Sequence, residues 1–207
     1  MPGTTLRRLN GFDDTPAELA ASTLLLIDCQ NTYTTGVLEL DGWRPALDVA
    51  ARLLERSRRD GAKVIHVVND GGDGTLYDIR ADIGRIHPSV APAGDEPVVV
   101  KRVPDAFHGT DLGRLVDEAG NDDLVVAGFM THMCVAFTAQ GAFLRGNRPT
   151  VVADACATRP LSAPGTELDA RQVHLGALAT VADLYGVVVP SAALLARTAG
   201  RGGTVPY

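Results

Sequence analysis

Six short apolar runs recur along the chain. They are rich in leucine, isoleucine and valine and do not alternate with polar residues, and they lie at Thr23–Ile27, Ala62–Val68, Pro97–Val100, Asp123–Ala127, Thr150–Ala153 and Gly186–Val189. Strands buried on both faces of a sheet have this composition. The runs therefore predict six buried strands.

Stretches with helical spacing of apolar residues separate these runs. Apolar side chains fall on one stripe with polar ones elsewhere, and a glycine follows several of the stretches. This pattern predicts helices at Pro45–Asp60, Thr110–Ala119, Cys134–Leu144 and Asp169–Tyr185, and a short one at Ser191–Arg197. Strands that alternate with helices predict an α/β fold, here a three-layer α/β/α sandwich with a mostly parallel, about six-stranded Rossmann-like sheet.

The length of 207 residues suits one domain, residues 1–207, with a full-sized core. Residues 1–20 are then a peripheral N-terminal extension, and residues 198–207 form a peripheral tail that is either flexible or docked in an oligomer. The glycine-rich segment 71–74 and the proline-containing segment 86–97 belong to one long excursion between the second and third strands. Such excursions are either functional or plain solvated loops.

Charge and cysteine content narrow the choice of partners and compartment. A formal net charge of −6 argues against nucleic acid or an anionic membrane as partner, because both require a basic face. No stretch approaches the ~20 apolar residues that cross a bilayer, and the N-terminus does not resemble a secretory signal. The three cysteines do not suggest a disulfide framework. We therefore expect a cytoplasmic protein with free thiols.

Three reactive side chains fall at strand ends. In a doubly wound sheet ligands bind beyond the carboxyl ends of the strands. The first strand leads into Asp28, the third into Lys101, and the fourth into a short loop and then Cys134. An acid, a base and a thiol are thus predicted to meet at one edge of the sheet.

Each of the three also has a structural interpretation. A carboxylate at a strand end is often a cap, and a lysine there is usually solvated. Cysteine is commonly buried as a core residue, which is what we expect of Cys29 and Cys156. Cys134 differs because it is predicted to open a helix, where the dipole and free N–H groups favour the thiolate.

Three ordered motifs resemble the isochorismatase-like cysteine hydrolases. The segment GFMTHMCVAFTAQGAFLRGNRPTVVADACAT is similar to the family pattern Gly-x-x-Thr-x-x-Cys-Val followed by Gly and Asp-Ala, which matches Gly128, Thr131, Cys134, Val135, Gly146, Asp154 and Ala155. IDCQNTY resembles the family's Asp-x-Gln motif, and VKRVPDAFHGTDL its lysine segment, which match Asp28, Gln30, Tyr33, Lys101, Phe107, Thr110 and Leu112. The resemblance runs from the first strand to the last.

The resemblance implies an amidohydrolase with a triad of Asp28, Lys101 and Cys134. The family includes nicotinamidases, several amidohydrolases, a streptothricin hydrolase group, and isochorismatases proper, which cleave a vinyl ether and lack the cysteine. Nicotinamidases carry a metal site marked by Asp-x-His and a further His. Here Asp70 is present without those histidines, so we expect no metal and no cofactor, as in the metal-free branch that includes the streptothricin hydrolase group. Relatives are commonly dimers or tetramers, which implies a homodimer or homotetramer.

The implied mechanism assigns further residues. Asp28 acts as general base and acid, Lys101 as electrostatic partner, and Cys134 as the nucleophile that forms a thioester with a small amide substrate. Backbone N–H groups of Met130 and Cys134 are the expected oxyanion donors, and the Phe129–Met130 peptide is cis in the family. Gln30 anchors either the substrate or a loop. Side chains that either line the substrate pocket or only pack in the fold are Tyr33, Phe107, Phe129, His132 and Met133.

Several roles stay open at the level of sequence. Trp43 reaches either the site or an interface, Arg159 and the loop to Leu168 form either a lid or a surface loop, and His66 is expected to be a hydrogen-bonded core residue. Two rival functions use the same fold: a vinyl-ether or ester hydrolase, and a non-catalytic small-molecule-binding protein. A nucleotide-binding protein is disfavoured because DCQNTY follows the first strand where a glycine-rich phosphate loop would be needed.

Overall fold

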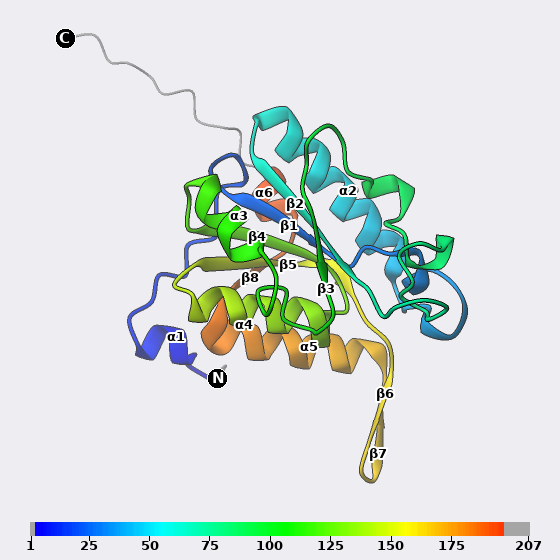
Figure 1. Cartoon of the computed structure of the whole chain (residues 1–207). Helices are drawn as coiled ribbons and strands as arrows, with labels where there is room; N and C mark the ends of the chain where they lie inside the picture. The colour runs from blue at the N-terminus through cyan, green and yellow to red at the C-terminus, as the bar shows by residue number, and fades with distance from the viewer. Residues whose placement is uncertain (1–2, 197–207) are drawn as a thin grey trace, which may run out of the picture.

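A computed structural model describes residues 3–196 of the chain, and a six-stranded parallel sheet forms its centre (Figure 1). Its order is β3-β2-β1-β4-β5-β8. The strands are β1 Thr23–Ile27, β2 Lys63–Asn69, β3 Val98–Lys101, β4 Asp123–Phe129, β5 Arg148–Ala157 and β8 Val187–Val189. All six predicted strands are confirmed, and the predicted three-layer α/β class is correct.

Helices cover both faces of this sheet. They are α1 Leu6–Leu9, α2 Trp43–Asp60, α3 Leu112–Ala119, α4 Ala136–Leu144, α5 Ala170–Thr180 and α6 Ala192–Leu195. Short 3₁₀ turns occur at Leu19–Ala21, Asn31–Tyr33, Gly36–Leu38, Asp82–Gly84 and Pro88–Val90. π-helical turns at Thr131–Val135 and Val181–Tyr185 precede α4 and follow α5.

Alternating residues of the buried strands supply two separate cores. Leu24 and Leu26 of β1 face α2 and α6, whereas Leu25 and Ile27 face α3, α4 and α5. Figure 1 shows α2 on one side of the sheet and α4 and α5 on the other. Burial on both faces explains why these strands carry continuous apolar runs instead of an alternating pattern.

Strand β4 requires a glycine where it passes β1. Gly128 pairs in register with Ile27 and has a φ of 125°. A Cβ at this position would overlap the carbonyl oxygen of Ile27. The close approach brings the carboxyl ends of β1 and β4 together, and the segments after them carry Asp28 and Cys134.

The structure has two features that the sequence pattern did not predict. The antiparallel hairpin of β6 Leu161–Ala163 and β7 Thr166–Leu168 projects from the body of the molecule (Figure 1). It occupies the segment expected to be a lid or a surface loop. The N-terminal extension also packs closely, because Ala17 and Leu19 are only 4% exposed and belong to the core. The predicted C-terminal tail 198–207 and the predicted helix end at Arg197 lie outside the described residues.

Candidate active site

Asp28 follows the last residue of β1 and is completely buried. Its backbone has a φ of 48°, a left-handed conformation that aspartate tolerates better than most residues. Its N–H donates to the carbonyl of Val67 on the neighbouring strand β2, at 2.9 Å. The predicted position of this carboxylate at a strand end is therefore confirmed.

Lys101, the last residue of β3, joins the acid to the thiol. Its Nζ lies 2.7 Å from Asp28 Oδ2 and donates a hydrogen bond of 3.2 Å to Cys134 Sγ. The Lys101 and Asp28 side chains are both 0% exposed, and Cys134 is 6% exposed. The three predicted reactive groups therefore meet in one buried cluster, with the sulfur nearest to solvent.

Cys134 does not open a helix, contrary to the sequence prediction. The helical segment begins at Thr131, and Cys134 is the fourth residue of a π-helical turn that leads into α4. The Val135 N–H donates to the carbonyl of Met130, five residues back, at 3.2 Å. Helical periodicity alone does not distinguish this wider turn from the start of an α-helix, which explains the error.

The thiol is also less acidic than the sequence suggested. Burial, and then the charge of Asp28, raise the pKa of Cys134 to about 12, although Lys101 acts in the opposite direction. Burial therefore opposes the thiolate that the sequence position was predicted to stabilise. Desolvation outweighs the favourable position near the beginning of a helical segment.

Burial affects the other two groups in opposite ways. It raises the pKa of Asp28, and the nearby Lys101 charge offsets only part of this effect. Burial alone would lower the pKa of Lys101, but the charges of Asp28 and Cys134 reverse the direction, so that the pKa is raised. An ion pair of Asp28 and Lys101 with a neutral thiol leaves the cluster without net charge, and the attraction within the pair offsets part of its desolvation cost.

The segment before Cys134 has an unusual backbone conformation. The peptide between Phe129 and Met130 is cis, as the resemblance implied. Met130 immediately precedes the π-helical turn that carries Cys134. The predicted oxyanion donors, the N–H groups of Met130 and Cys134, thus belong to one short segment of backbone.

Aromatic side chains form one wall beside the cluster, from Tyr77, Tyr33 and Phe129. The rings of Tyr33 and Phe129 meet edge to face at 5.9 Å, and Tyr33 makes a similar contact with Tyr77. The two tyrosine hydroxyls lie 3.3 Å apart. Because Tyr33 and Phe129 are each 1% exposed, their surroundings are dominated by packing in this structure.

Gln30 has its side-chain amide fully occupied by the fold. Its Nε2 donates to the carbonyls of Asn69 and Gly84, and its Oε1 accepts from the Asn69 N–H. Of the two predicted roles, these contacts correspond to anchoring a loop. The amide therefore ties the chain beyond Asp28 to the segment that follows β2.

His132 lies on the π-helical turn that carries Cys134, here called the nucleophile turn after the predicted role of this residue, and is half-buried. Its Nδ1 is hydrogen bonded to Thr158 Oγ1, beyond the end of β5. Burial, and then the charge of Arg159, lower the pKa of His132. Met133 packs against both cores, and Phe107 packs against the core that contains Cys134. These predicted residues thus surround the turn.

A protein-family model, the isochorismatase domain, matches residues 22–189, which is most of the chain. The chain belongs to the isochorismatase family. The crystal structure of an isochorismatase from Pseudomonas putida KT2440 (PP1826) has 39% sequence identity and a TM-score of 0.91, over 93% of this chain and 100% of that one. The predicted family resemblance and fold are therefore confirmed.

Two hydrolases of the family share enough sequence to be informative. Streptothricin hydrolase of Streptomyces noursei is 37% identical over 68% of this chain and 51% of its own length. Maleamate amidohydrolase of Pseudomonas putida is 31% identical over 72% of this chain and 75% of its own. The chain is thus a hydrolase of the isochorismatase family, and the resemblance to streptothricin hydrolase is confirmed.

In this isochorismatase-family chain Cys29, Cys156 and His66 are part of the packing. Cys29 and Cys156 are buried free thiols, as predicted. His66 is 1% exposed and its Nε2 lies 2.9 Å from Glu96 Oε2, which confirms a hydrogen-bonded core residue. Trp43 is buried at the start of α2, where its ring lies 6.0 Å from that of His87.

Sequence reasoning missed three partners of the site. His174 on α5 is hydrogen bonded through Nδ1 to Thr131 Oγ1 at 2.9 Å. Tyr77 and Arg80 belong to the excursion after β2, and no motif singled them out. The three aspartates that precede Arg80 in this segment were a usable signal for it. Among residues 3–196, no group of three or more His, Cys, Asp or Glu side chains is arranged to hold a metal ion.

Proposed function

We propose that this chain hydrolyses a C–N amide-type bond of a small molecule through a thioester on Cys134. One observation carries the proposal: Lys101 Nζ contacts both the Asp28 carboxylate and the Cys134 sulfur inside a buried cluster. A nucleophile, a proton acceptor and a cation at this spacing are what acyl transfer requires.

The sequence of steps follows from the charges. Asp28 accepts the thiol proton as Sγ attacks the amide carbonyl, and the oxyanion receives hydrogen bonds from the N–H groups of Met130 and Cys134. The C–N bond breaks as Asp28 returns the proton to the departing nitrogen. Asp28 then deprotonates a water that attacks the thioester, and the proton finally returns to the sulfur.

The raised pKa of Cys134 fits a thiol that is activated only during the reaction. With a pKa of about 12 the sulfur is protonated at neutral pH. Proton transfer to Asp28 must therefore accompany attack on the carbonyl. Lys101 stabilises the developing thiolate in this step, because its Nζ already donates to Sγ.

An amide is favoured over a vinyl ether because of the nucleophile. Isochorismatases proper resemble this chain but lack the cysteine, so their chemistry does not require the cluster described above. The name of the related maleamate amidohydrolase supports C–N cleavage. The substrate itself is not chosen by the triad, because specificity depends on the surrounding side chains.

Arg159 indicates the charge of the substrate. Its Nε is buried and makes no hydrogen bond, and no carboxylate among residues 3–196 pairs with it. Its charge acts on His132 in the nucleophile turn. This Nε is a buried donor without an acceptor, which is costly, and an anionic group on the substrate would supply one. We therefore propose an amide substrate that carries a carboxylate.

Compartment and assembly belong to the same proposal. None of the helices described within residues 3–196 is long and apolar enough to span a membrane. We propose a cytoplasmic homodimer or homotetramer. Light scattering of the purified chain tests the oligomeric state.

A substrate panel with adduct trapping tests the function. We expect ammonia or amine release from at least one carboxylate-bearing amide, urea or carbamoyl compound, and a mass increase on Cys134 after acid quenching. Cys134→Ala should lower turnover on the order of 10³-fold or more, whereas Cys156→Ser serves as the matched control at a buried thiol. Turnover retained by Cys134→Ala would favour a vinyl-ether or ester hydrolase. If no compound of the panel gives turnover or an adduct, the non-catalytic binding protein would be favoured.

A further inference from the structure

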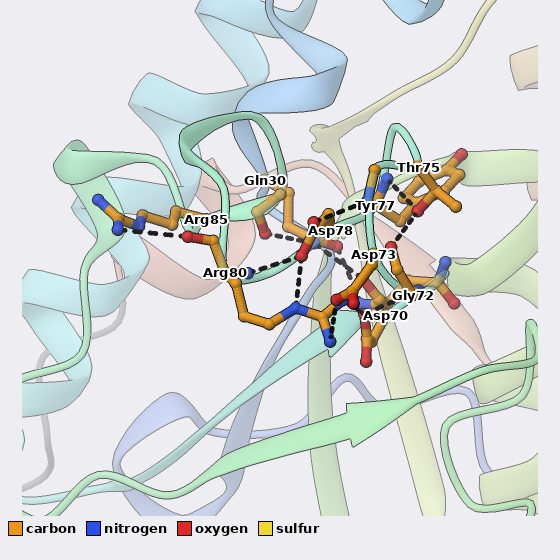
Figure 2. A network of polar contacts seen from close by, with 12 residues as sticks. Gln30, Asp70, Gly72, Asp73, Thr75, Tyr77, Asp78, Arg80 and Arg85 are labelled. Atoms are coloured by element: carbon orange, nitrogen blue, oxygen red, sulfur yellow. Dashed lines mark hydrogen bonds and ion pairs between the residues drawn. The ribbon is translucent and has the colours of Figure 1, made fainter.

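The loop of residues 70–84, here called the β2 loop, folds around the side chain of Arg80. Figure 2 shows its guanidinium facing three aspartates of the same loop. Arg80 Nε lies 2.6 Å from Asp78 Oδ1, and another of its nitrogens lies 2.7 Å from Asp73 Oδ1. A third contact reaches Asp70 Oδ1 at 3.6 Å. One cation thus cross-links the beginning, middle and end of the loop.

The carboxylates also organise the loop backbone. Asp78 accepts hydrogen bonds from the N–H groups of Gly74 and Arg80, at 2.9 and 3.1 Å. Asp70 accepts one from Gly72 at 3.0 Å. These bonds place Asp70 and Asp78 where each is only 8% exposed. Arg102 also lies 3.6 Å from Asp70 Oδ2, but Arg80 reaches all three carboxylates, whose like charges repel one another.

The β2 loop is attached to the catalytic cluster at three points. The Asp70 N–H donates to the carbonyl of Lys101 at 2.9 Å. The Gln30 amide binds the carbonyls of Asn69, just before the loop, and of Gly84 at its end. In the middle, the Tyr77 hydroxyl meets Tyr33, whose ring packs on Phe129. A displacement of the loop would therefore move the aromatic wall beside the nucleophile turn.

We propose that Arg80 is a positioning residue, a built-in counter-cation that holds the β2 loop as a wall of the substrate pocket. It acts through the three aspartates and Tyr77, and it does not touch the reacting atoms. The geometry of the loop stands by itself, and only the effect on turnover rests on the proposed function.

Hydrogen exchange of the full chain tests the loop directly. In Arg80→Ala we expect amides of residues 70–84 to exchange about tenfold faster, since three partly exposed ion pairs are lost. Protection of β1 and β4 should be unchanged. Ethylguanidinium chloride should restore protection in the variant, whereas an equal concentration of sodium chloride should not. Arg80→Lys, which keeps the charge without the planar fork, should be intermediate.

Arg85→Ala is the matched control. Arg85 is exposed on the chain just after the same loop, and its guanidinium makes one hydrogen bond of 3.5 Å, to the Arg80 carbonyl (Figure 2). It should leave the exchange pattern unchanged. Wild-type exchange in Arg80→Ala, or a loosened loop that ethylguanidinium does not restore, would overturn the proposal.

The kinetic readout separates this proposal from the proposed function. With a substrate in hand, Arg80→Ala should raise KM on the order of 10-fold with a smaller change in kcat, because the wall binds substrate and the triad is intact. A fall in kcat at unchanged KM would contradict a role in the pocket wall. If no substrate is found, the exchange and rescue results still decide the role of Arg80 in the loop.

Discussion

Lys101 Nζ lies 2.7 Å from Asp28 Oδ2, and neither side chain is exposed to solvent. This pair joins the ends of β3 and β1, which are separated in the sheet by β2. Removing one member leaves the other as an isolated charge in the interior. The same pair therefore affects both the stability of the fold and the proposed reaction.

Lys101→Met should lower the free energy of unfolding by about 3–5 kcal/mol, because Asp28 is left without its cation. The loss of stability caused by Lys101→Met should depend on pH. Burial raises the pKa of Asp28, and loss of Lys101 removes the opposing charge. A raised carboxyl pKa favours folding at low pH, and this contribution is lost as pH rises above the unfolded value toward the folded one. Urea unfolding should thus show a larger loss of unfolding free energy in the variant at pH 8 than at pH 5. Equal losses at the two pH values would contradict this prediction.

Alkylation of Cys134 by iodoacetamide should be slow at pH 6 and rise steadily toward alkaline pH, because the thiol pKa is raised to about 12. The charge of Asp28 is one cause of that shift. Asp28→Asn should therefore be alkylated faster at a given pH although it loses hydrolytic activity. Peptide mapping of the labelled protein measures both rates, with Cys156 as internal reference, and slower labelling of Asp28→Asn would refute the assignment.

Gly128→Ala should prevent correct folding or severely destabilise the protein. The new methyl group would overlap the Ile27 carbonyl, and the φ of 125° is unfavourable for alanine. Thermal unfolding should show the loss, and Gly176→Ala is a suitable control because a Cβ there has open space. An unchanged melting temperature in Gly128→Ala would show that the two strands separate easily.

Glu96 should contribute stability that disappears in acid. Hydrogen bonds from Arg58, against the opposing effect of burial, lower the pKa of Glu96 from 4.5 to about 2. The contribution is thus complete above pH 4.5 and is lost as pH falls toward 2. Glu96→Gln should destabilise the protein by about 1–2 kcal/mol at pH 7, after allowance for solvent screening. Unfolding at pH 7 and pH 3 measures this difference, which should shrink in acid.

Arg159 should determine which substrates bind. Arg159→Met should raise KM for a carboxylate-bearing amide by on the order of 10-fold or more and leave the matching neutral amide nearly unchanged, since one charged hydrogen-bonding partner is lost. Arg159→Lys should restore part of the affinity. Steady-state kinetics with the paired substrates give the comparison, and equal effects on both would remove Arg159 from the binding site.

The sequence predicted the six strands and the main helices because each carries a local pattern of apolar residues. It also predicted that Asp28, Lys101 and Cys134 meet, since parallel strands bring their carboxyl ends to one edge. It did not predict the hairpin of β6 and β7, whose short strands have no apolar alternation. The predicted ranges of β4 and β5 were shorter than the strands in the structure, because Gly128 and Asp154 interrupt the apolar runs.

The residues by themselves determined the family, the sheet and the three polar side chains that meet at its edge, because local patterns and motifs specify all of these. Only the tertiary structure decided the state of those groups. The pKa of Cys134 depends on burial and on Asp28, distant in the chain. The β2 loop depends on Arg80 meeting three carboxylates at once. Desolvation and charge convergence are properties of a folded interior, so no linear pattern specifies them.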